Sequence, residues 1–233
     1  MEYTAKLLQE NFWAIDQGGV RCFLFVGEEK AVLIDTGFGG DLKAVCDVIT
    51  DNPIVLITTH SDRDHIGSDE QFPEQYMHPA EFDAYERHSG KPTHAKPIWE
   101  GDTITVGGYT LEVVLASGHT PGSIMLLERE KKFIISGDSL QTGTIYLFGD
   151  GRNLKAFRAS MTKLEKLWKD GAFDTIYPSH GSLDVPADVI PDHIALADAL
   201  LAGTLEPIGP GLDRFPSDVQ TYEFGRVKMY YAK

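Results

Sequence analysis

Residues 58 to 67 place four metal-capable side chains directly after a short apolar segment. Residues 54 to 57 follow Pro53 and have the length and composition of a buried strand. A loop that leaves the end of such a strand can turn several side chains toward a common point. The four candidates, which fall within six residues, are His60, Asp62, Asp64 and His65. Imidazole and carboxylate together suit zinc, iron or manganese. The stretch therefore predicts a metal site, with a solvated polar loop as the alternative.

The composition predicts a globular chain and argues against two classes of partner. Of the 233 residues, 42% are hydrophobic, which supplies a core for one large domain or two small ones. The net charge of −14 argues against phosphate backbones and anionic lipids as main partners. We therefore expect no nucleic-acid partner and no membrane partner.

The N-terminal residues and the two cysteines predict a cytoplasmic location. Residues 1 to 10 carry charge and lack an apolar signal core, and no segment reaches the length of a membrane span. Cys22 and Cys46 lie in apolar surroundings without CxxC spacing. This is typical of reduced cysteines in the core of a cytosolic protein.

Strand patterns interrupted by occasional helices predict layered β-sheets covered by helices. Alternating or continuous apolar runs bounded by glycine turns indicate strands. Apolar residues at helical spacing and capping residues such as Asp41 and Gly203 indicate helices. We expect strands at 12–16, 20–26, 31–34, 54–57, 75–78, 103–106, 109–115, 123–127, 133–135 and 174–177, and a closing strand or hairpin at 222–231. We expect helices at 41–50, 79–88, 153–169 and 191–202, and loops at 89–97 and 204–218.

Three more candidate ligands follow predicted strands further along the chain. His119 lies in the sequence SGHTPG, Asp138 in SGD, and His180 in SHG. Each stands beside glycine, which lets the backbone bend and approach closely. Any one of them alone is typical of a turn. All three follow predicted strands, as the loop at 58–67 does, and together they favour a shared metal site.

At this point the chain resembles the metallo-β-lactamase superfamily. The family pattern is His-x-His-x-Asp-His, then His in a Gly-His-Thr-Pro-Gly context, then Gly-Asp, then a final His. Here the matches in order are His60, Asp64, His65, His119, Asp138 and His180. The resemblance covers about residues 12 to 185 and includes the LIDTG segment at 33–37. It implies an α+β fold, a four-layer αββα sandwich, formed by residues 1–233 as a single domain. Residues 186–233 would add a C-terminal helix, a loop and the closing strand.

The resemblance also implies two divalent metal ions and a ligand for each position. By position, His60, Asp62 and His119 would hold the first metal, and Asp64, His65 and His180 the second. Asp138 would bridge the two. Asp62 departs from the family pattern, which has His there. A third carboxylate makes the site less positive and shifts its preference toward harder ions. We expect zinc first, with iron or manganese as alternatives because of Asp62.

The function that the resemblance implies is hydrolysis of a small molecule. A hydroxide bound to both metals would attack an ester, thioester, lactone or related bond, with Asp64 orienting the water. The chain has no Gly-x-Ser-x-Gly motif, so no covalent intermediate is expected. Glutathione thioesters are a weaker prediction because residues 186–233 are short and poor in Lys and Arg. The substrate and the oligomeric state do not follow from the sequence, although a homodimer through the C-terminal segment is an open alternative.

Two other functions are kept as alternatives. Flavodiiron proteins carry Glu at the position of Asp62, which suggests a di-iron oxidoreductase or oxygen-binding protein without a flavin domain. A metal-stabilised scaffold without catalysis is the last alternative.

The remaining polar and aromatic candidates have structural interpretations. Asp35 is interpreted as a turn residue or as support for the metal loop. His78 is expected to be structural, and His88, His94 and His193 to be surface or loop residues. Trp99, Tyr146 and Phe148 are expected to pack in the core. Residues 146 to 148 could instead line a pocket, because they follow the Asp138 turn closely.

Overall fold

A computed structural model describes residues 2–232 of the chain. Contacts between Cα atoms divide it into two compact units, one ending at Val113 and the other beginning at Val114. Each unit is described by itself. No helix in the described part of the chain is long and apolar enough to cross a membrane.

A seven-stranded sheet forms the centre of the N-terminal unit, with its strands in sequence order. The first four strands pair antiparallel, and the pairs from β4 to β7 are parallel. Its strands are β1 (Thr4–Gln9), β2 (Phe12–Gln17), β3 (Val20–Val26), β4 (Ala31–Ile34), β5 (Ile54–Thr58), β6 (Glu74–Met77) and β7 (Lys96–Pro97). Parallel neighbours place their carboxyl ends at the same edge of a sheet. The segments that follow β4 and β5 therefore lie side by side.

Helices connect the parallel strands of this unit. They are α1 (Leu42–Ile49), the 3-10 helices η1 (Asp69–Gln71) and η2 (Pro79–Glu81), and α2 (Phe82–Ser89). Asp41 caps α1, because its carboxylate accepts a hydrogen bond from the amide of Ala44 at 3.1 Å. The apolar face of α1, with Leu42 and Cys46, packs into a buried cluster that includes Leu24, Leu33 and Leu56. Both cysteines of the chain are buried and free, as their surroundings in the sequence predict.

The hairpin of β8 (Thr103–Val106) and β9 (Tyr109–Leu115) follows the seven-stranded sheet in the chain. Its turn consists of Gly107 and Gly108, both with positive φ. A Cβ atom at Gly107 would lie 2.1 Å from the carbonyl oxygen of Val26, so only glycine fits there.

The C-terminal unit contains two groups of paired strands. One group is β10 (Ile124–Glu128), β11 (Phe133–Gly137), β13 (Thr175–Pro178) and β14 (Val185–Pro186). Within it β11 and β13 run parallel, so the residues after both strands share one edge. The other is a four-stranded sheet in the order β12 (Thr144–Leu147), β17 (Val227–Tyr231), β16 (Gln220–Phe224) and β15 (Gly209–Pro210).

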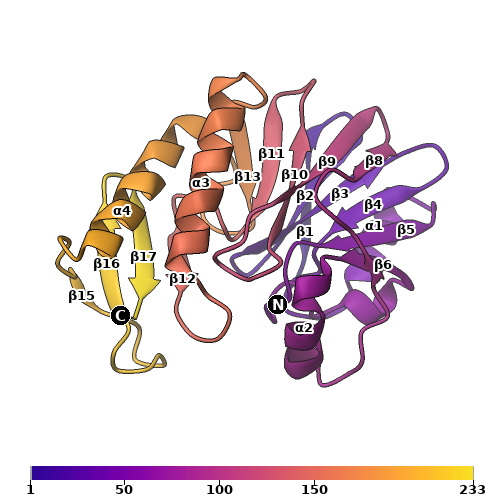
Figure 1. Cartoon of the computed structure of the whole chain (residues 1–233). Helices are drawn as coiled ribbons and strands as arrows, with labels where there is room; N and C mark the ends of the chain where they lie inside the picture. The colour runs from indigo at the N-terminus through magenta and orange to yellow at the C-terminus, as the bar shows by residue number, and fades with distance from the viewer. Residues whose placement is uncertain (1, 233) are drawn as a thin grey trace. The chain divides into compact units, whose positions relative to one another are not determined.

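Two helices pack together over this unit, α3 (Leu154–Lys169) and α4 (Ile190–Ala202), the second preceded by η3 (Ala187–Val189). Figure 1 shows the two helices side by side, with β16 and β17 beside α4. Phe157 and Met161 of α3 are fully buried with Leu196 of α4 in the main apolar core of the unit. Asn153 caps α3 through the amide of Ala156, and Gly203 ends α4 with a left-handed φ of 67°.

Most of the predicted elements are confirmed within one or two residues. The strands β3, β4, β8 and β9 have the predicted bounds. The strands β1, β12 and β14 and the 3-10 helices η1 and η3 were not predicted. The predicted loop at 89–97 ends in the two-residue strand β7, which pairs with β6. The predicted loop at 204–218 contains the short strand β15, and the predicted hairpin at its end is formed by β16 and β17.

Candidate metal centre

The predicted metal loop follows β5 in the N-terminal unit, as the sequence indicates. His60 and His65 are buried, whereas Asp62 and Asp64 are partly exposed. The two imidazole rings lie 4.0 Å apart between centroids. His60 Nε2 is 3.6 Å from Asp62 Oδ2, and His65 Nε2 is 3.9 Å from Asp64 Oδ1. The loop thus brings all four predicted ligands together within this unit.

One buried carboxylate, that of Asp35, supports both histidines. Its Oδ2 atom lies 2.8 Å from Nδ1 of His65 and accepts a hydrogen bond from the Thr59 hydroxyl at 2.7 Å. The Oδ1 atom accepts from the backbone amide of Thr59, also at 2.7 Å. The same hydroxyl is 3.0 Å from Nδ1 of His60. Asp35, directly or through Thr59, therefore fixes both rings at Nδ1, and their Nε2 atoms face away from it.

The parallel pairing of β4 with β5 explains why Asp35 reaches the metal loop. Ile34 and Ile57 are register partners, and the amide of Asp35 donates to the carbonyl of Ile57 at 3.0 Å. Asp35 itself has a left-handed φ of 60°, which Asp tolerates better than most residues. These contacts agree with the interpretation of Asp35 as a support for the loop. Its left-handed φ is typical of a turn position, although the assigned turn begins two residues later at Gly37.

Helix α2 and η2 hold the metal loop from another direction. Glu81, which is fully buried, accepts hydrogen bonds from the amide and the hydroxyl of Ser61 at 2.9 and 2.7 Å. Nδ1 of His88 lies 2.6 Å from the carbonyl oxygen of Ser61. Ser61 stands between His60 and Asp62, so these contacts fix the backbone of the loop between two candidate ligands. The sequence did not predict Glu81, because a single Glu at a helix start is typical of a solvated first turn.

Asp138 and His180 meet at one edge of the C-terminal unit. Gly137 at the end of β11 pairs with Pro178 at the end of β13, and the amide of Ser179 donates to the Gly137 carbonyl at 3.0 Å. The residues that follow both strands are therefore adjacent. Nε2 of His180 lies 3.3 Å from Oδ2 of Asp138.

His119 reaches the same carboxylate from the loop after β9. Its Nε2 atom is 3.8 Å from Asp138 Oδ2, and its Nδ1 atom is 2.8 Å from the backbone carbonyl of Tyr146 in β12. Gly118 has a φ of 141°, and a Cβ atom there would lie 2.4 Å from Phe157 Cα. Glycine is therefore required beside this histidine. The C-terminal unit thus brings together all three of its predicted ligands.

The residues of each unit fit divalent metal ions. Ligand atoms about 2.0–2.2 Å from a tetrahedral ion lie roughly 3.3–3.6 Å from one another. The four pairs of Nε2 and carboxylate atoms are 3.3 to 3.9 Å apart, longer than a hydrogen bond and close to this spacing. His60, His65 and His119 each have an oxygen atom beside Nδ1. Metal-ligating histidines have such a partner, which leaves Nε2 for the metal.

Among the remaining histidines, the surface or loop position predicted for His193 is wrong. It lies in α4, is fully buried, and its Nε2 atom is 2.9 Å from the carbonyl of Gln141. Burial lowers the pKa of His193 to about 4, so the ring is neutral. The sequence does not show that His193 is buried, because polar and apolar residues of α4 are not clearly separated onto two faces of the helix. His78 caps η2 through the amide of Ala80, as expected of a structural residue, and His94 is exposed.

Trp99 also differs from its expected role. Its side chain is 53% exposed, although core packing was the first interpretation, and it contacts the ring of His78 edge to face. Tyr146 and Phe148 are half-buried and belong to an aromatic cluster with residues of the C-terminal segment.

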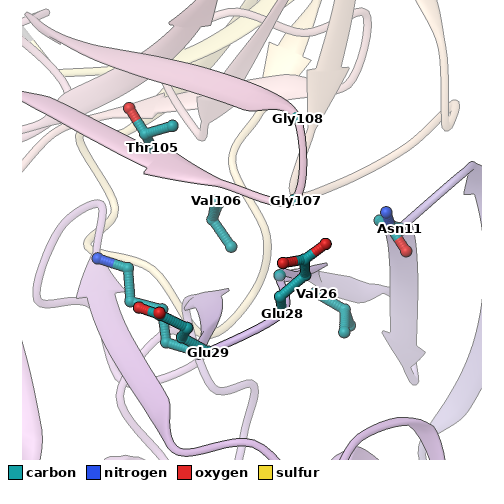
Figure 2. Close-up of a pocket in the computed structure, with 10 residues that line it drawn as sticks. Asn11, Val26, Glu28, Glu29, Thr105, Val106, Gly107 and Gly108 are labelled. Atoms are coloured by element: carbon teal, nitrogen blue, oxygen red, sulfur yellow. The ribbon is translucent and has the colours of Figure 1, made fainter.

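A cavity of about 470 Å³ lies away from these ligands. It is lined by Asn11, by the turn between β3 and β4 with Glu28 and Glu29, and by the turn of the β8–β9 hairpin (Figure 2). The β3–β4 turn precedes β4, whereas Asp35 follows it. This cavity is therefore at the opposite end of β4 from the metal loop, and it contains none of the predicted ligands.

The structure gathers His and Asp side chains that could hold metal ions at the ends of strands. The family model of the metallo-beta-lactamase superfamily matches residues 15–225, and the chain belongs to that superfamily. Its fold is therefore the predicted α+β sandwich, and the chain is an enzyme of a hydrolase family. The superfamily typically binds divalent metals, for which the chain has candidate His and Asp ligands.

Several known proteins are similar to this chain. An acyl-coenzyme A thioesterase MBLAC2 from Gallus gallus is 27% identical over 215 residues, covering 74% of this chain and 76% of that protein. The probable metallo-hydrolase MJ0888 of Methanocaldococcus jannaschii is 26% identical and covers 69% of this chain and 87% of that protein. Among solved structures, a metallo-beta-lactamase from Pontibacter korlensis has a TM-score of 0.70 at 19% identity, covering 84% of this chain and 99% of that one. At that identity the likeness shows the fold alone.

Proposed function

We propose that the protein is a binuclear metal hydrolase that cleaves acyl thioesters or closely related esters of a small molecule. The single observation that carries this proposal is the set of histidine Nε2 atoms facing carboxylates at the spacing of metal ligands. The thioesterase name of the Gallus gallus relative favours thioesters among the bonds that such a site cleaves. A cytoplasmic location and a homodimer remain predictions.

The proposed ligand sets follow the positions of the family pattern. His60, Asp62 and His119 would hold the first ion, and Asp64, His65 and His180 would hold the second. Asp138 would be the ligand that both ions share. Its Oδ2 atom has His119 Nε2 at 3.8 Å and His180 Nε2 at 3.3 Å, as a carboxylate shared by two ions needs. Zinc is the first candidate, and iron or manganese remain alternatives because Asp62 adds a hard oxygen ligand.

The chain's own residues perform the positioning that hydrolysis needs. Two divalent ions, when bound, supply Lewis acidity and lower the pKa of water to about 7. Asp64 is partly exposed beside His65, so its second carboxylate oxygen can accept a hydrogen bond from an attacking water and orient it. The buried network of Asp35 and Thr59 keeps both loop histidines in the tautomer that presents Nε2.

The alternative of a flavodiiron-like protein receives no support from the relatives reported above, whose names are those of hydrolases. Asp62 remains the motivation for this alternative.

The test is hydrolysis of a substrate panel by the purified protein after loading with zinc, manganese or iron. The panel contains acyl thioesters, oxygen esters, a lactone and a phosphodiester, and free thiol or acid is measured. The proposal predicts thioester turnover that a chelator abolishes and that added metal restores. Turnover of none of these compounds with any metal, by protein that holds about two equivalents, would exclude the hydrolase assignment.

A further inference from the structure

The four-stranded sheet of the C-terminal unit has one face in the core and one face that carries aromatic side chains. Ile145 and Leu147 of β12 and Met229 of β17 are buried in the apolar core of the unit. Tyr146 alternates with them and therefore points to the other face. Its register partner is Tyr230 of β17, which shares that face.

Four aromatic rings form a cluster on this second face, which we call the aromatic wall: Tyr146, Phe148, Tyr230 and Phe215. Phe215 comes from the loop before β16 and contacts the other three, with ring centroids 5.4, 4.7 and 5.1 Å from Tyr146, Phe148 and Tyr230. Tyr146 and Tyr230 are 5.1 Å apart. All four side chains are only half-buried. The wall therefore keeps apolar area available for a ligand.

An arginine stands at the edge of the aromatic wall. The guanidinium of Arg214 lies 5.3 Å from the centre of the Phe215 ring, and its Nη2 atom is 3.4 Å from the hydroxyl of Tyr146. Arg21, Arg158 and Arg226 are in ion pairs with carboxylates. Arg214 has no such pair within the part of the chain that the structure describes, residues 2–232. The chain has 35 acidic residues, yet none of those described pairs with Arg214. The N–H groups of its guanidinium can therefore bind an anionic ligand.

The aromatic wall is joined to a proposed metal ligand through the backbone. The carbonyl oxygen of Tyr146 lies 2.8 Å from Nδ1 of His119, while the Tyr146 ring belongs to the wall. One residue therefore supports the ligand with its main chain and the wall with its side chain. The aromatic wall therefore includes a residue that directly contacts a proposed metal ligand.

We propose that the aromatic wall and Arg214 form a subsite for an apolar or aryl substrate chain that ends in an anionic group. This inference rests on the proposed function for its link to hydrolysis, and it names the substrate class of that site. The rings bury the chain, and Arg214 binds the anion with charge-assisted hydrogen bonds. The anion is either a carboxylate on the acyl half of the substrate or a phosphate on its thiol half.

Equilibrium binding to the metal-free protein tests the subsite without relying on turnover. The probes are phenylbutyrate, phenylbutyl phosphate and phenylbutanol, which share the aryl chain and differ in the end group. Calorimetry should give tighter binding of one or both anions than of the alcohol. A preference for the carboxylate assigns the anion to the acyl half, and a preference for the phosphate assigns it to the thiol half. Equal binding of all three, or none, would overturn the proposal.

Two variants and two matched controls separate charge from apolar contact. Arg214→Gln should weaken binding of the preferred anion by about tenfold and leave the alcohol unchanged, because only the charge is removed. Phe215→Leu should weaken the binding of all three probes, because it removes an aromatic contact that they share. Arg87→Gln, at an exposed residue of α2, and Phe224→Leu, at a 41% exposed residue of β16, should behave as the unaltered protein. Equal anion affinity in Arg214→Gln would exclude the subsite even if the protein hydrolyses thioesters.

The alternative occupant of the aromatic wall is a second copy of the chain. Sedimentation at increasing protein concentration tests it: a dimer that Phe215→Leu dissociates and that the probes do not disturb would replace the proposed subsite. Conversely, probe binding that depends on Arg214, in a protein that cleaves no thioester, would leave the subsite standing and exclude the proposed reaction.

Discussion

Asp35 and His65 are joined by a buried contact of 2.8 Å between Oδ2 and Nδ1. Both side chains are almost inaccessible to solvent, and 30 residues of sequence separate them. The contact depends on the parallel pairing of β4 with β5, which places the end of one strand beside the start of the metal loop. A carboxylate in this position fixes the tautomer of the ring and raises the basicity of Nε2.

We predict that Asp35→Asn lowers the metal affinity of the protein by about 10- to 100-fold, because the amide supports His65 without the negative charge. The substitution keeps the side-chain shape and the tolerance of a left-handed φ. Competition with a chromogenic chelator measures the affinity. Asp51→Asn, at an exposed position, is the control. An affinity within twofold of the unaltered protein would show that Asp35 has only its turn role.

Glu81 gives a second prediction about the metal loop. Its Oε2 atom accepts two hydrogen bonds from Ser61, and a glutamine would offer these donors a neutral amide oxygen in place of a charged carboxylate oxygen. We expect Glu81→Gln to weaken metal binding and to lower the free energy of unfolding by about 1–3 kcal/mol, the usual effect on a buried charged hydrogen bond. With cobalt as the bound ion, the visible absorption spectrum should also change as the loop ligands shift. Glu86→Gln on the exposed side of α2 should leave the spectrum unaltered. An unchanged spectrum in Glu81→Gln would exclude a positioning role for this residue.

Asp62 sets the metal preference if it binds the first ion. Asp62→His restores the nitrogen ligand of the family pattern and removes one negative charge. We expect the variant to keep its activity and to bind zinc more strongly relative to iron, because imidazole is a softer ligand than carboxylate. Equilibration with equal amounts of both ions, followed by elemental analysis, measures this preference. The same zinc-to-iron ratio in both proteins would mean that Asp62 does not reach the first metal.

His193 makes the fold sensitive to mild acid. Burial lowers its pKa to about 4, and the charges of Asp192 and Arg226 act on it in opposite directions. The unfolded chain binds a proton near pH 6.5, so stability from the neutral ring is complete above that pH and is lost as the pH falls toward 4. The full loss is on the order of 3 kcal/mol. Chemical unfolding at several pH values measures this loss. Between pH 6.5 and 4, the free energy of unfolding should decrease less in His193→Gln than in the unaltered protein. The same decrease in both proteins would exclude His193 as the cause of the acid sensitivity.

The sequence predicts the positions of the candidate ligands because each one follows a strand in a recognisable pattern. His60, His119, Asp138 and His180 stand beside glycine or at the end of an apolar run, and both signals are local. The supports of these ligands are not predicted in the same way. Glu81 and the carbonyl of Tyr146 contact Ser61 and His119 only because distant segments pack together. A pattern of neighbouring residues carries no information about such contacts.

The elements that the sequence analysis missed have weak local patterns. The strand β1 has three polar or charged residues among six and lies at the edge of its sheet, paired with β2 alone in that sheet. The strand β12 has only four residues and lies between turn-like segments, so its pairing with β17 decides its conformation. His193 was misplaced for a related reason: its neighbours in α4 are mostly apolar on every side, and the packing of α4 on α3 and on β16 determines which face is buried.

Elemental analysis of the untagged protein, produced without added metal, tests the central claim most directly when Asp138→Ala is measured beside it. The proposed site predicts about two equivalents of a divalent metal in the unaltered protein, with zinc as the main ion. The variant lacks the bridging carboxylate and should retain little or no metal, while its circular dichroism spectrum remains that of a folded chain. Two equivalents of metal retained by Asp138→Ala, or none bound by the unaltered protein even after reconstitution, would contradict the binuclear site.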